Sequence, residues 1–288
     1  MKVSLLHNRD AGDGFRLGEV RRVIEAAGHE VVHDLEAGSD PVPILPSDVD
    51  LLAVAGGDGT VRKAVDAFEG ARRPFAILPF GTANNIARVL GYDGPLDALP
   101  RRWANGRRMA FDVGVARGKW GERRFLEGVG IRLIPEFLRT AKERLEENGD
   151  GDAGAQLELS RRVFRETLAL LKPQRCALTV DGDRLEGEFL FVEVLNIGAI
   201  GPRLSILPEA DPSDGFLDLV TAGEEGRDEL LALLDENPSG GRPALPTRRV
   251  RRVEMLDWGS LHIDGKIEAG DDGAVSVGVE PGRVEFLV

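Results

Sequence analysis

The first hundred residues alternate short apolar runs with segments of helical periodicity, and this alternation limits the fold more than any other feature. Val49–Ala55 is almost entirely apolar, which is typical of a strand that is buried on both faces. In Val20–Ala27 the apolar residues recur at the three- and four-residue spacing of a helix face. The pattern predicts an α/β domain with an open, mostly parallel sheet covered by helices. The predicted strands are Lys2–Leu6, Glu30–His33, Val49–Ala55 and Phe75–Leu78, and the predicted helices are Phe15–Ala27, Val61–Phe68 and Asn84–Leu90.

The pattern changes after residue 110. Several later runs alternate apolar and polar residues, as half-buried antiparallel strands do, and Asp181-Gly182 between two of them predicts a tight hairpin turn. Helical periodicity returns only in Ile134–Glu147 and Leu157–Leu171. We expect a mostly antiparallel β-sandwich or distorted barrel, with domains at 1–112 and 113–288 and the last strand packing back on the first domain. The predicted strands are Phe111–Val115, Arg175–Val180, Glu188–Leu195, Phe216–Thr221, Arg248–Leu256, Ser260–Ile263, Ala274–Val279 and Val284–Val288.

The charge of the chain bears on its partners. The net charge is −12, and residues 1–130 hold 18 basic and 18 acidic residues, so the whole acidic excess lies in residues 131–288. This excess argues against nucleic-acid binding, which needs a basic face against the phosphates. No apolar run approaches the roughly 18 residues of a membrane span, and the single cysteine, Cys176, excludes an intramolecular disulfide. We therefore expect a cytoplasmic protein, with at most a peripheral contact to a membrane.

The segment Gly56-Gly57-Asp58-Gly59-Thr60 follows a buried strand directly and opens a helix. Glycines at this point let backbone N–H groups approach a phosphate, and the helix N-terminus and the Thr60 hydroxyl add to the attraction. Asp58 would repel a phosphate, so it fits better as a partner of a magnesium ion that the nucleotide carries. The alternative is a glycine-rich turn with an aspartate near the helix cap. The place of the segment at the carboxyl end of a strand favours a ligand site.

A second segment, Gly81-Thr82-Ala83-Asn84, stands in the same context of buried strand, glycine turn and helix start. Taken alone, Thr82 and Asn84 are better explained as helix caps. A third segment, which contains Asn8 and ends at Gly12, is by itself only a turn signal. Because two such turns end neighbouring strands, one shared nucleotide cleft is the stronger interpretation.

Together these segments resemble the diacylglycerol kinase catalytic-domain family, which includes sphingosine kinases and bacterial lipid kinases. The family pattern of Asn-Pro-x-x-Gly, Gly-Gly-Asp-Gly-Thr and Gly-Thr-x-Asn-Asp corresponds here to Asn8–Gly12, Gly56–Thr60 and Gly81–Asn85. Pro208–Asp218 is similar to the family signature Pro-x-Ala-x-x-x-Asp-Gly-x-Leu-Asp, and Asp264-Gly265-Lys266 is similar to its Asp-Gly-Glu. The resemblance covers nearly the whole chain and implies an NAD kinase/diacylglycerol kinase-like fold.

The resemblance also implies an activity, which is transfer of the γ-phosphoryl group of ATP to a lipid hydroxyl such as that of diacylglycerol or a sphingosine-like acceptor. ATP would lie between the two domains, and Asp264 would be the catalytic base. A structural magnesium would lie at Asp214, with backbone oxygens near Asp211 and Phe216, while Asp58 and Asp112 would belong to the network of the nucleotide's magnesium. The lipid would be met transiently at a membrane surface, and a homodimer is a further possibility. The ATP-binding residues would be Asn8, Gly56, Gly57, Asp58, Gly59, Thr60, Gly81, Thr82 and Asn84.

The sequence departs from the family at several positions. Arg9 replaces a proline, Arg62-Lys63 replaces Asn-Glu, Asn85 replaces an aspartate and Lys266 replaces a glutamate. Polar or acidic positions thereby become neutral or basic, which affects the expected metal network. Two alternatives stay open: an NAD kinase-like enzyme that acts on a soluble hydroxyl, and a non-catalytic relative that binds nucleotide or lipid.

Overall fold

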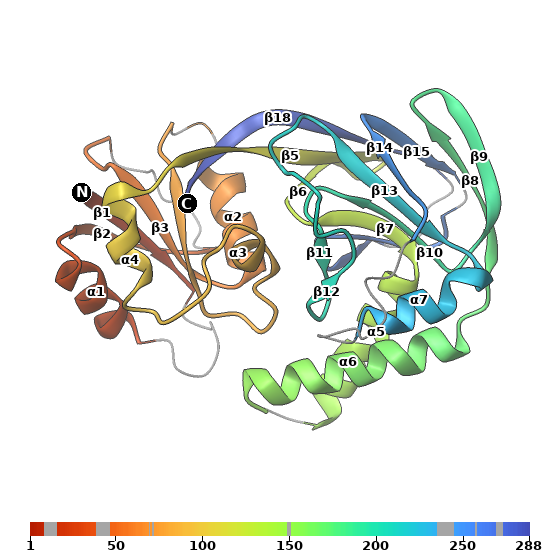
Figure 1. The fold of residues 1–288 in the computed structure, drawn as a ribbon, viewed down its shortest axis with the longest axis horizontal. Helices are drawn as coiled ribbons and strands as arrows, with labels where there is room; N and C mark the ends of the chain where they lie inside the picture. Colours follow the sequence, from red (N-terminus) through yellow and green to blue (C-terminus); the bar gives the residue numbers. More distant parts are fainter. Residues whose placement is uncertain are drawn as a thin grey trace. The chain divides into compact units, whose positions relative to one another are not determined.

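The computed structural model describes residues 1–8, 16–38, 47–68, 70, 72–148, 151–234, 245–256, 258–268 and 273–288. The chain divides into two compact units, one formed by residues 1–111 with 282–288 and the other by residues 112–281. The sequence analysis placed the boundary after residue 112 and the last strand on the first domain. In the structure, the strands β5 (Arg108–Gly118) and β18 (Val275–Leu287) run from one unit into the other (Figure 1).

The first unit contains the predicted parallel sheet, in the order β2-β1-β3-β4-β18. All of these neighbours pair in parallel, with Val3 opposite Leu51 and Leu52 opposite Phe75. β3 is buried along its whole length, as its apolar sequence predicted. The elements are β1 (Lys2–His7), α1 (Leu17–Ala26), β2 (Glu30–Glu36), β3 (Leu51–Gly56), α2 (Asp58–Phe68), β4 (Phe75–Pro79), α3 (Asn85–Val89), α4 (Leu99–Arg102) and the 3₁₀ helix η2 (Trp103–Asn105).

The C-terminal segment belongs to the first unit because backbone and aromatic contacts attach it there. Val288 and Arg107 exchange two backbone hydrogen bonds, of 2.6 and 2.9 Å. The Phe286 ring lies 5.1 Å from the Phe111 ring, centroid to centroid, and the Tyr92 hydroxyl donates to the Leu287 carbonyl. These contacts add a fifth parallel strand to the sheet beside β4.

The second unit is the predicted antiparallel β-sandwich. One sheet has the order β14-β13-β10-β7-β16-β17, and the other contains β18, β15, β8 and β9 with β5 and β6. Side chains such as Val129, Val194 and Val253 fill the space between them. The remaining elements are β6 (Gly121–Phe125), β7 (Gly128–Arg132), β8 (Gln174–Val180), β9 (Asp183–Phe189), β10 (Phe191–Leu195), β11 (Ala199–Ile200), β12 (Leu204–Ser205), β13 (Leu217–Ala222), η3 (Glu224–Gly226), β14 (Thr247–Val250), β15 (Arg252–Leu256), β16 (Leu261–Ile263) and β17 (Lys266–Glu268).

Three helices cover the other face of the six-stranded sheet. They are α5 (Leu133–Asn148), α6 (Ala153–Leu170) and α7 (Arg227–Ala232). α5 contacts β7, β10 and β16, and it also packs along α6, which contacts α7 (Figure 1). Their buried side chains, among them Phe137, Phe164 and Leu230, form a second core with Phe191 and Leu195 of β10.

Some strand boundaries differ from the prediction. Arg248–Leu256 is two strands, β14 and β15, which belong to different sheets. The chain breaks between them because the Asp181 carboxylate accepts the N–H groups of Arg251 (3.0 Å) and Arg252 (2.8 Å). Conversely, the two predicted C-terminal strands are the single strand β18, which continues through Gly282 at a φ of +58°.

One ion pair is wholly buried in the second unit. His262 Nε2 lies 3.0 Å from both carboxylate oxygens of Glu193, and neither residue is exposed to solvent. Both stand opposite Gly130 in the sheet, where an added Cβ would lie 2.0 Å from the Glu193 carboxylate. Burial raises the pKa of the Glu193 carboxyl, and His262 opposes that rise. The pair therefore depends on a glycine between its members.

We predict that His262→Ala destabilises the fold by about 3–5 kcal/mol, because it leaves a buried carboxyl group without its partner. His33→Ala is the matched control, since His33 pairs with Asp48 at 3.3 Å on the surface. An exposed pair of that kind contributes about 1 kcal/mol or less. Urea unfolding of both variants measures the difference. Equal losses in the two variants would contradict a special role for the buried pair.

Candidate functional site

The N-terminus of α2 is built by the turn that follows β3. The N–H groups of Thr60 and Val61 donate to the Gly57 carbonyl, at 2.8 and 3.1 Å, and so start the helix. Gly59 is exposed, and a Cβ placed on it would meet no atom within 4 Å. Within the described residues its N–H makes no hydrogen bond. Such a helix start, at an exposed glycine whose N–H is not used by the described residues, is suited to an anion.

The turns after β3 and β4 touch each other through their backbones. A Cβ on Gly57 would lie 2.8 Å from the Gly81 Cα, and one on Gly81 would lie 2.5 Å from the Gly57 Cα. The Phe80 N–H also donates to the Gly56 carbonyl at 3.0 Å. Gly57 and Gly81 are thus required by the contact between two turns, a reason that the sequence analysis did not anticipate. The structure brings the two predicted phosphate segments side by side.

Asp58 ties the same two turns together. Its carboxylate accepts the N–H groups of Asn85 (3.0 Å) and Ile86 (2.9 Å) at the start of α3. Burial raises the pKa of Asp58, and the backbone donors oppose this. A carboxylate has about four lone-pair sites, so contact with a magnesium ion through water remains compatible with these bonds. The sequence-predicted role of Asp58 beside such an ion stays a prediction.

Asn84 closes its own turn. It adopts the left-handed conformation, with a φ of +53°, which asparagine tolerates better than most residues. Its Oδ1 accepts the Gly81 N–H at 2.8 Å and its Nδ2 donates to the Gly81 carbonyl at 2.6 Å. The side chain makes no cap hydrogen bond to α3. Both polar groups of the Asn84 side chain are therefore used in shaping the turn. Thr82, which belongs to the same turn, is half-buried.

The other predicted ATP-binding residues are placed in part. The Asn8 N–H donates to the Ala55 carbonyl at 3.4 Å, so Asn8 follows β1 beside the end of β3. The rest of that segment, Arg9 to Gly12, lies outside the described residues. Thr60 is buried, and its side chain would be 2.5 Å from a Cβ on Gly56. The carboxyl ends of β1, β3 and β4 thus share one edge of the parallel sheet.

In the second unit, Asp264 holds a turn between two strands. Its carboxylate accepts the backbone N–H groups of Leu126 (2.9 Å), Glu127 (2.9 Å) and Gly128 (3.2 Å). Asp264 itself has a φ of +45°, and its N–H donates to the Gly128 carbonyl at 3.0 Å. The sequence-predicted base is therefore fixed in orientation by the Leu126–Gly128 turn.

Asn196 and Asp112 meet the same turn. Asn196 is 2% exposed, and its Nδ2 donates to the carbonyls of Asp112 (2.9 Å) and Leu126 (3.0 Å). Asp112 is 1% exposed, and its carboxylate accepts the Gly215 N–H at 2.7 Å. A polar network therefore links Asp264, Asn196, Asp112 and the loop before β13. In the sequence, the feature that points to Asn196 is that a polar residue directly follows the apolar end of a strand.

The residues predicted to hold a structural magnesium make local bonds instead. Asp211 accepts the N–H and hydroxyl of Ser213, at 3.0 and 2.6 Å. Asp214 accepts the Phe216 N–H at 2.9 Å and the guanidinium of Arg249. Nowhere in the part of the chain that the structure describes do three acidic, histidine or cysteine side chains form a group that could hold a metal ion. The magnesium expected at Asp214, with backbone oxygens near Asp211 and Phe216, stays a prediction from the sequence.

Similarity to known proteins decides the family. Residues 2–116 match the model described as diacylglycerol kinase catalytic domain, and residues 139–288 match the YegS C-terminal NAD kinase beta sandwich-like domain. The chain therefore combines a diacylglycerol kinase catalytic domain with the C-terminal domain of the YegS family, to which it belongs. The resemblance predicted from the sequence motifs is confirmed.

Relatives in this family include named kinases. The chain is 25% identical over 265 residues to a diacylglycerol kinase of Bacillus subtilis (strain 168), which covers 87% of this chain and 84% of the relative. It is 28% identical over 185 residues to "Probable lipid kinase YegS-like" of Klebsiella pneumoniae (strain 342), a match that spans 63% of this chain and 59% of the relative's length. These names describe the relatives.

Solved structures share the fold. A structure from Bacillus anthracis str. Sterne has a TM-score of 0.74 at 21% identity and covers 99% of this chain and 97% of its own. An NAD kinase from Archaeoglobus fulgidus in complex with ATP has a TM-score of 0.53 at 13% identity, over 100% of this chain and 94% of its own. The predicted combination of an α/β domain with an NAD kinase-like β-sandwich is confirmed.

The positions that depart from the diacylglycerol kinase family pattern lie in defined surroundings. Arg62 pairs with Asp66 at 2.9 Å along α2, with 14% of its side chain exposed. Asn85 is 2% exposed, and its N–H is one of the Asp58 donors. Lys266 is exposed on β17, two residues after Asp264. Arg62 and Asn85 are thus parts of the folded turn region of this family member.

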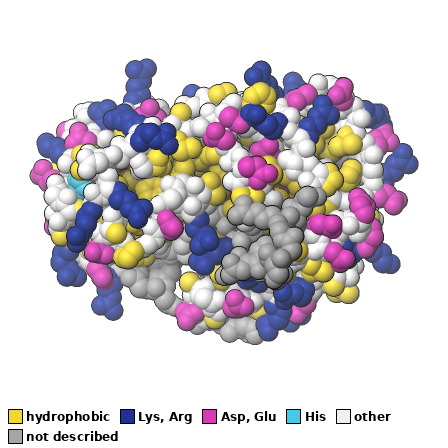
Figure 2. Space-filling view, in the orientation of Figure 1, with side chains coloured by type: hydrophobic (Ala, Val, Ile, Leu, Met, Phe, Trp, Pro, Cys, Tyr) yellow, Lys and Arg dark blue, Asp and Glu magenta, His cyan; other side chains and the backbone are white. Residues whose placement is uncertain are grey.

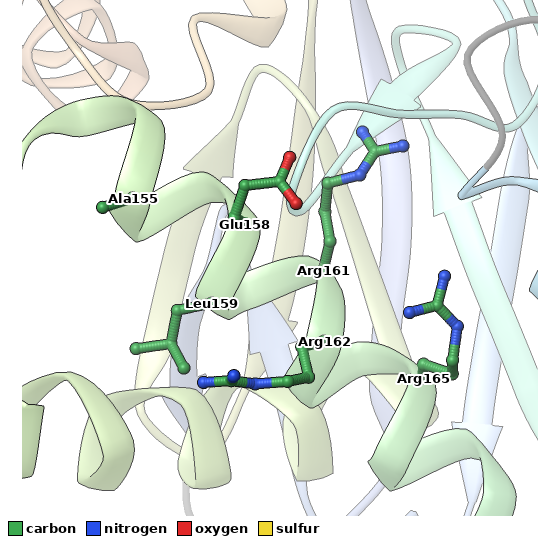
Figure 3. A pocket seen from close by; sticks show the side chains of 6 residues that line it. All are labelled: Ala155, Glu158, Leu159, Arg161, Arg162 and Arg165. Carbon is green, nitrogen blue, oxygen red and sulfur yellow. The ribbon is translucent and has the colours of Figure 1, made fainter.

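A pocket of about 480 Å³ lies on α6, and none of its described lining residues belongs to a motif. It is lined by Ala155, Glu158, Leu159, Arg161, Arg162 and Arg165. In Figure 3, Glu158 and Arg161 point to one side of the helix, while Arg162 points the other way beside Leu159. The guanidinium groups do not converge on one point. On the face drawn in Figure 2, basic and acidic side chains are likewise interspersed.

No helix among the described residues is both long enough and apolar enough to cross a membrane.

We predict opposite effects for two alanine substitutions in the same turn. Gly57→Ala should destabilise the first unit by about 1–3 kcal/mol, the usual cost of overpacking, because its Cβ meets the Gly81 backbone at 2.8 Å. Gly59→Ala should leave stability equal or raise it by at most about 1 kcal/mol, since alanine favours a helix over glycine. Denaturant unfolding measures both. A Gly59→Ala protein as unstable as Gly57→Ala would contradict the open space at Gly59.

Proposed function

We propose that the protein is an ATP-dependent kinase that transfers the γ-phosphoryl group to a hydroxyl of a lipid, with a diacylglycerol- or sphingosine-like acceptor. The observation that carries the proposal is the open, donor-bearing start of α2 at Gly59, built by the family's Gly-Gly-Asp-Gly-Thr segment. Relatives named diacylglycerol kinase and lipid kinase support the acceptor class. We further propose that the lipid is met transiently at a membrane surface.

The first unit would bind the nucleotide phosphates. The exposed Gly59 N–H and the positive end of α2 attract the anionic charge, and Asp58 and the Gly57–Gly81 contact hold the turns in place beforehand. Magnesium bound with ATP neutralises charge on the β- and γ-phosphates. Asp58 is the residue of this turn that would contact it, through water. That ATP lies between the two units stays a prediction from the sequence.

The second unit would supply the base. The acceptor oxygen attacks the γ-phosphorus, the bond from that phosphorus to the β–γ bridging oxygen breaks, and ADP leaves with that electron pair. The acceptor's proton passes to the Asp264 carboxylate, which the Leu126–Gly128 turn holds in a fixed orientation. The transfer depends mainly on positioning and charge neutralisation, as phosphoryl transfers do.

A product panel tests the function. The protein is incubated with ATP, magnesium and each of diacylglycerol, a sphingoid base, a polyol and NAD, with the lipids in neutral or anionic vesicles, and products are identified by mass spectrometry. We expect a phosphorylated lipid, and lipid turnover that depends on the vesicle and weakens with salt. Phosphorylated NAD alone would support the NAD kinase-like alternative. Nucleotide binding without any product would support a non-catalytic relative.

We predict that Gly59→Ala weakens ATP binding by about tenfold or more, the effect of about 1.4 kcal/mol. The added methyl group occupies the open space where a phosphate would approach the backbone. Isothermal titration of ATP measures the affinity, with thermal unfolding as the check that the variant is folded. Unchanged ATP affinity in the folded variant would remove this turn from the nucleotide site.

We predict that Asp264→Asn lowers turnover by about 10²–10⁴-fold, the usual range for loss of a general base, while ATP affinity persists. The asparagine keeps the shape, and its carbonyl oxygen can still accept the Glu127 and Gly128 N–H groups, but its amide NH₂ cannot accept the Leu126 N–H. Asp181→Asn is the matched control, because Asp181 also accepts backbone N–H bonds in a turn, from Arg251 and Arg252. Full turnover in Asp264→Asn would show that another group takes the proton.

A further inference from the structure

An arginine of β14 lies at the carboxylate, in the loop before β13, to which the family resemblance assigns a metal. One oxygen of Asp214 accepts the Phe216 N–H at 2.9 Å, and the other accepts from the Arg249 guanidinium. The Asp211 carboxylate turns away into its own bonds with Ser213. Both Asp214 oxygens are therefore engaged by groups of the chain itself.

Arg249 is directed to this place by the sheet and by an aromatic ring. It stands opposite Asp218 in the β13–β14 pair, so its backbone position is fixed beside the loop. Its Cζ lies 4.4 Å from the centroid of the Phe216 ring, and the Cζ of Arg251 lies 4.6 Å from the same centroid. A guanidinium over an aromatic ring is held by a cation–π interaction. Arg249 is thus fixed at three points: its strand, a ring and a carboxylate.

The surroundings of Arg249 are acidic. Asp218 stands opposite Arg249 in the β13–β14 pair, and the Asp214 carboxylate accepts from the Arg249 guanidinium. A divalent ion at Asp214 would share a carboxylate oxygen with Arg249 or with the Phe216 N–H, and it would stand beside the positive charge of that guanidinium. Mg²⁺ also takes near-octahedral oxygen ligands, and among the described residues no three acidic, histidine or cysteine side chains gather to offer them.

We propose that Arg249 is the built-in counter-ion of Asp214, and that this loop folds without a bound metal. The guanidinium supplies the positive charge and the hydrogen bond that a metal would otherwise supply at that carboxylate. The proposal does not depend on the kinase activity, because it concerns the folding of the loop without nucleotide. Measurements without nucleotide therefore separate the two proposals.

Thermal unfolding of the nucleotide-free, full-length protein tests this. The midpoint is measured with EDTA, with millimolar MgCl₂, and with NaCl of equal ionic strength, for the wild type, Arg249→Gln, Asp214→Asn and the double variant. We expect the wild-type midpoint to be the same in all three solutions within error. Arg249→Gln should lower it by about 2–4 °C, the shift for about 1 kcal/mol in a domain of this size. In the double variant the loss should be less than the sum of the two single losses.

Arg248→Gln is the matched control. It removes the same charge from the neighbouring residue of β14, whose guanidinium pairs with the exposed Asp183 at 2.9 Å, and it should leave the midpoint nearly unchanged. A rise in the wild-type midpoint with MgCl₂ over NaCl that Asp214→Asn abolishes would overturn the proposal, because it shows a metal at that carboxylate. A midpoint of Arg249→Gln equal to that of the wild type would overturn it as well.

Discussion

The contact between two glycine turns, with the Asp58 carboxylate beside it, is the interaction on which the first unit's site depends. Gly57 and Gly81 approach so closely that neither can have a side chain without movement of the other's backbone. Asp58 then joins the start of α2 to the start of α3 through two backbone donors. Two strand ends that would otherwise carry independent loops become one rigid surface, and the open donor at Gly59 acquires a fixed position on it.

The second unit uses the same device with different residues. A short turn, Leu126–Gly128, gives its three N–H groups to Asp264 and its first carbonyl to Asn196. Carboxylate and amide side chains thus hold backbone segments that are far apart in sequence. In both units the acidic residues of the family motifs shape the backbone in addition to any contact with a ligand. Their substitution affects stability and chemistry together, so variants need both measurements.

Much of the fold could be predicted from the sequence because a strand that is buried on both faces has an almost entirely apolar sequence. The apolar run Leu51–Ala55 indicates a central parallel strand without knowledge of its neighbours. β7 was missed because Gly128 and Gly130 interrupt its alternation. Position 130 is a glycine because a Cβ there would overlap the Glu193 carboxylate, which pairs with His262. Such a requirement comes from residues more than sixty positions away, which no local pattern contains.

The same limit applies to the break between β14 and β15 and to the candidate site. Apolar and polar residues alternate on both sides of Arg251, yet the strands enter different sheets because Asp181 holds the backbone there. In the site, the motif identified the right segments, but the tasks of Asn84 and Asp58 became clear only from their partners at Gly81, Asn85 and Ile86. Arg249 was part of a basic cluster in the sequence, and only the strand pairing assigned it to Asp214.

The division of β18 between the two units has a consequence for synthesis of the chain. Residues 1–111 leave the ribosome first, whereas the segment 282–288 that completes their sheet follows the entire second unit. Until that segment arrives, β4 presents an unpaired edge, and such edges invite pairing with other chains. The nascent first unit therefore lacks its last strand during translation of the whole second unit. That strand, the end of β18, can pair with β4 only after the second unit has been synthesised.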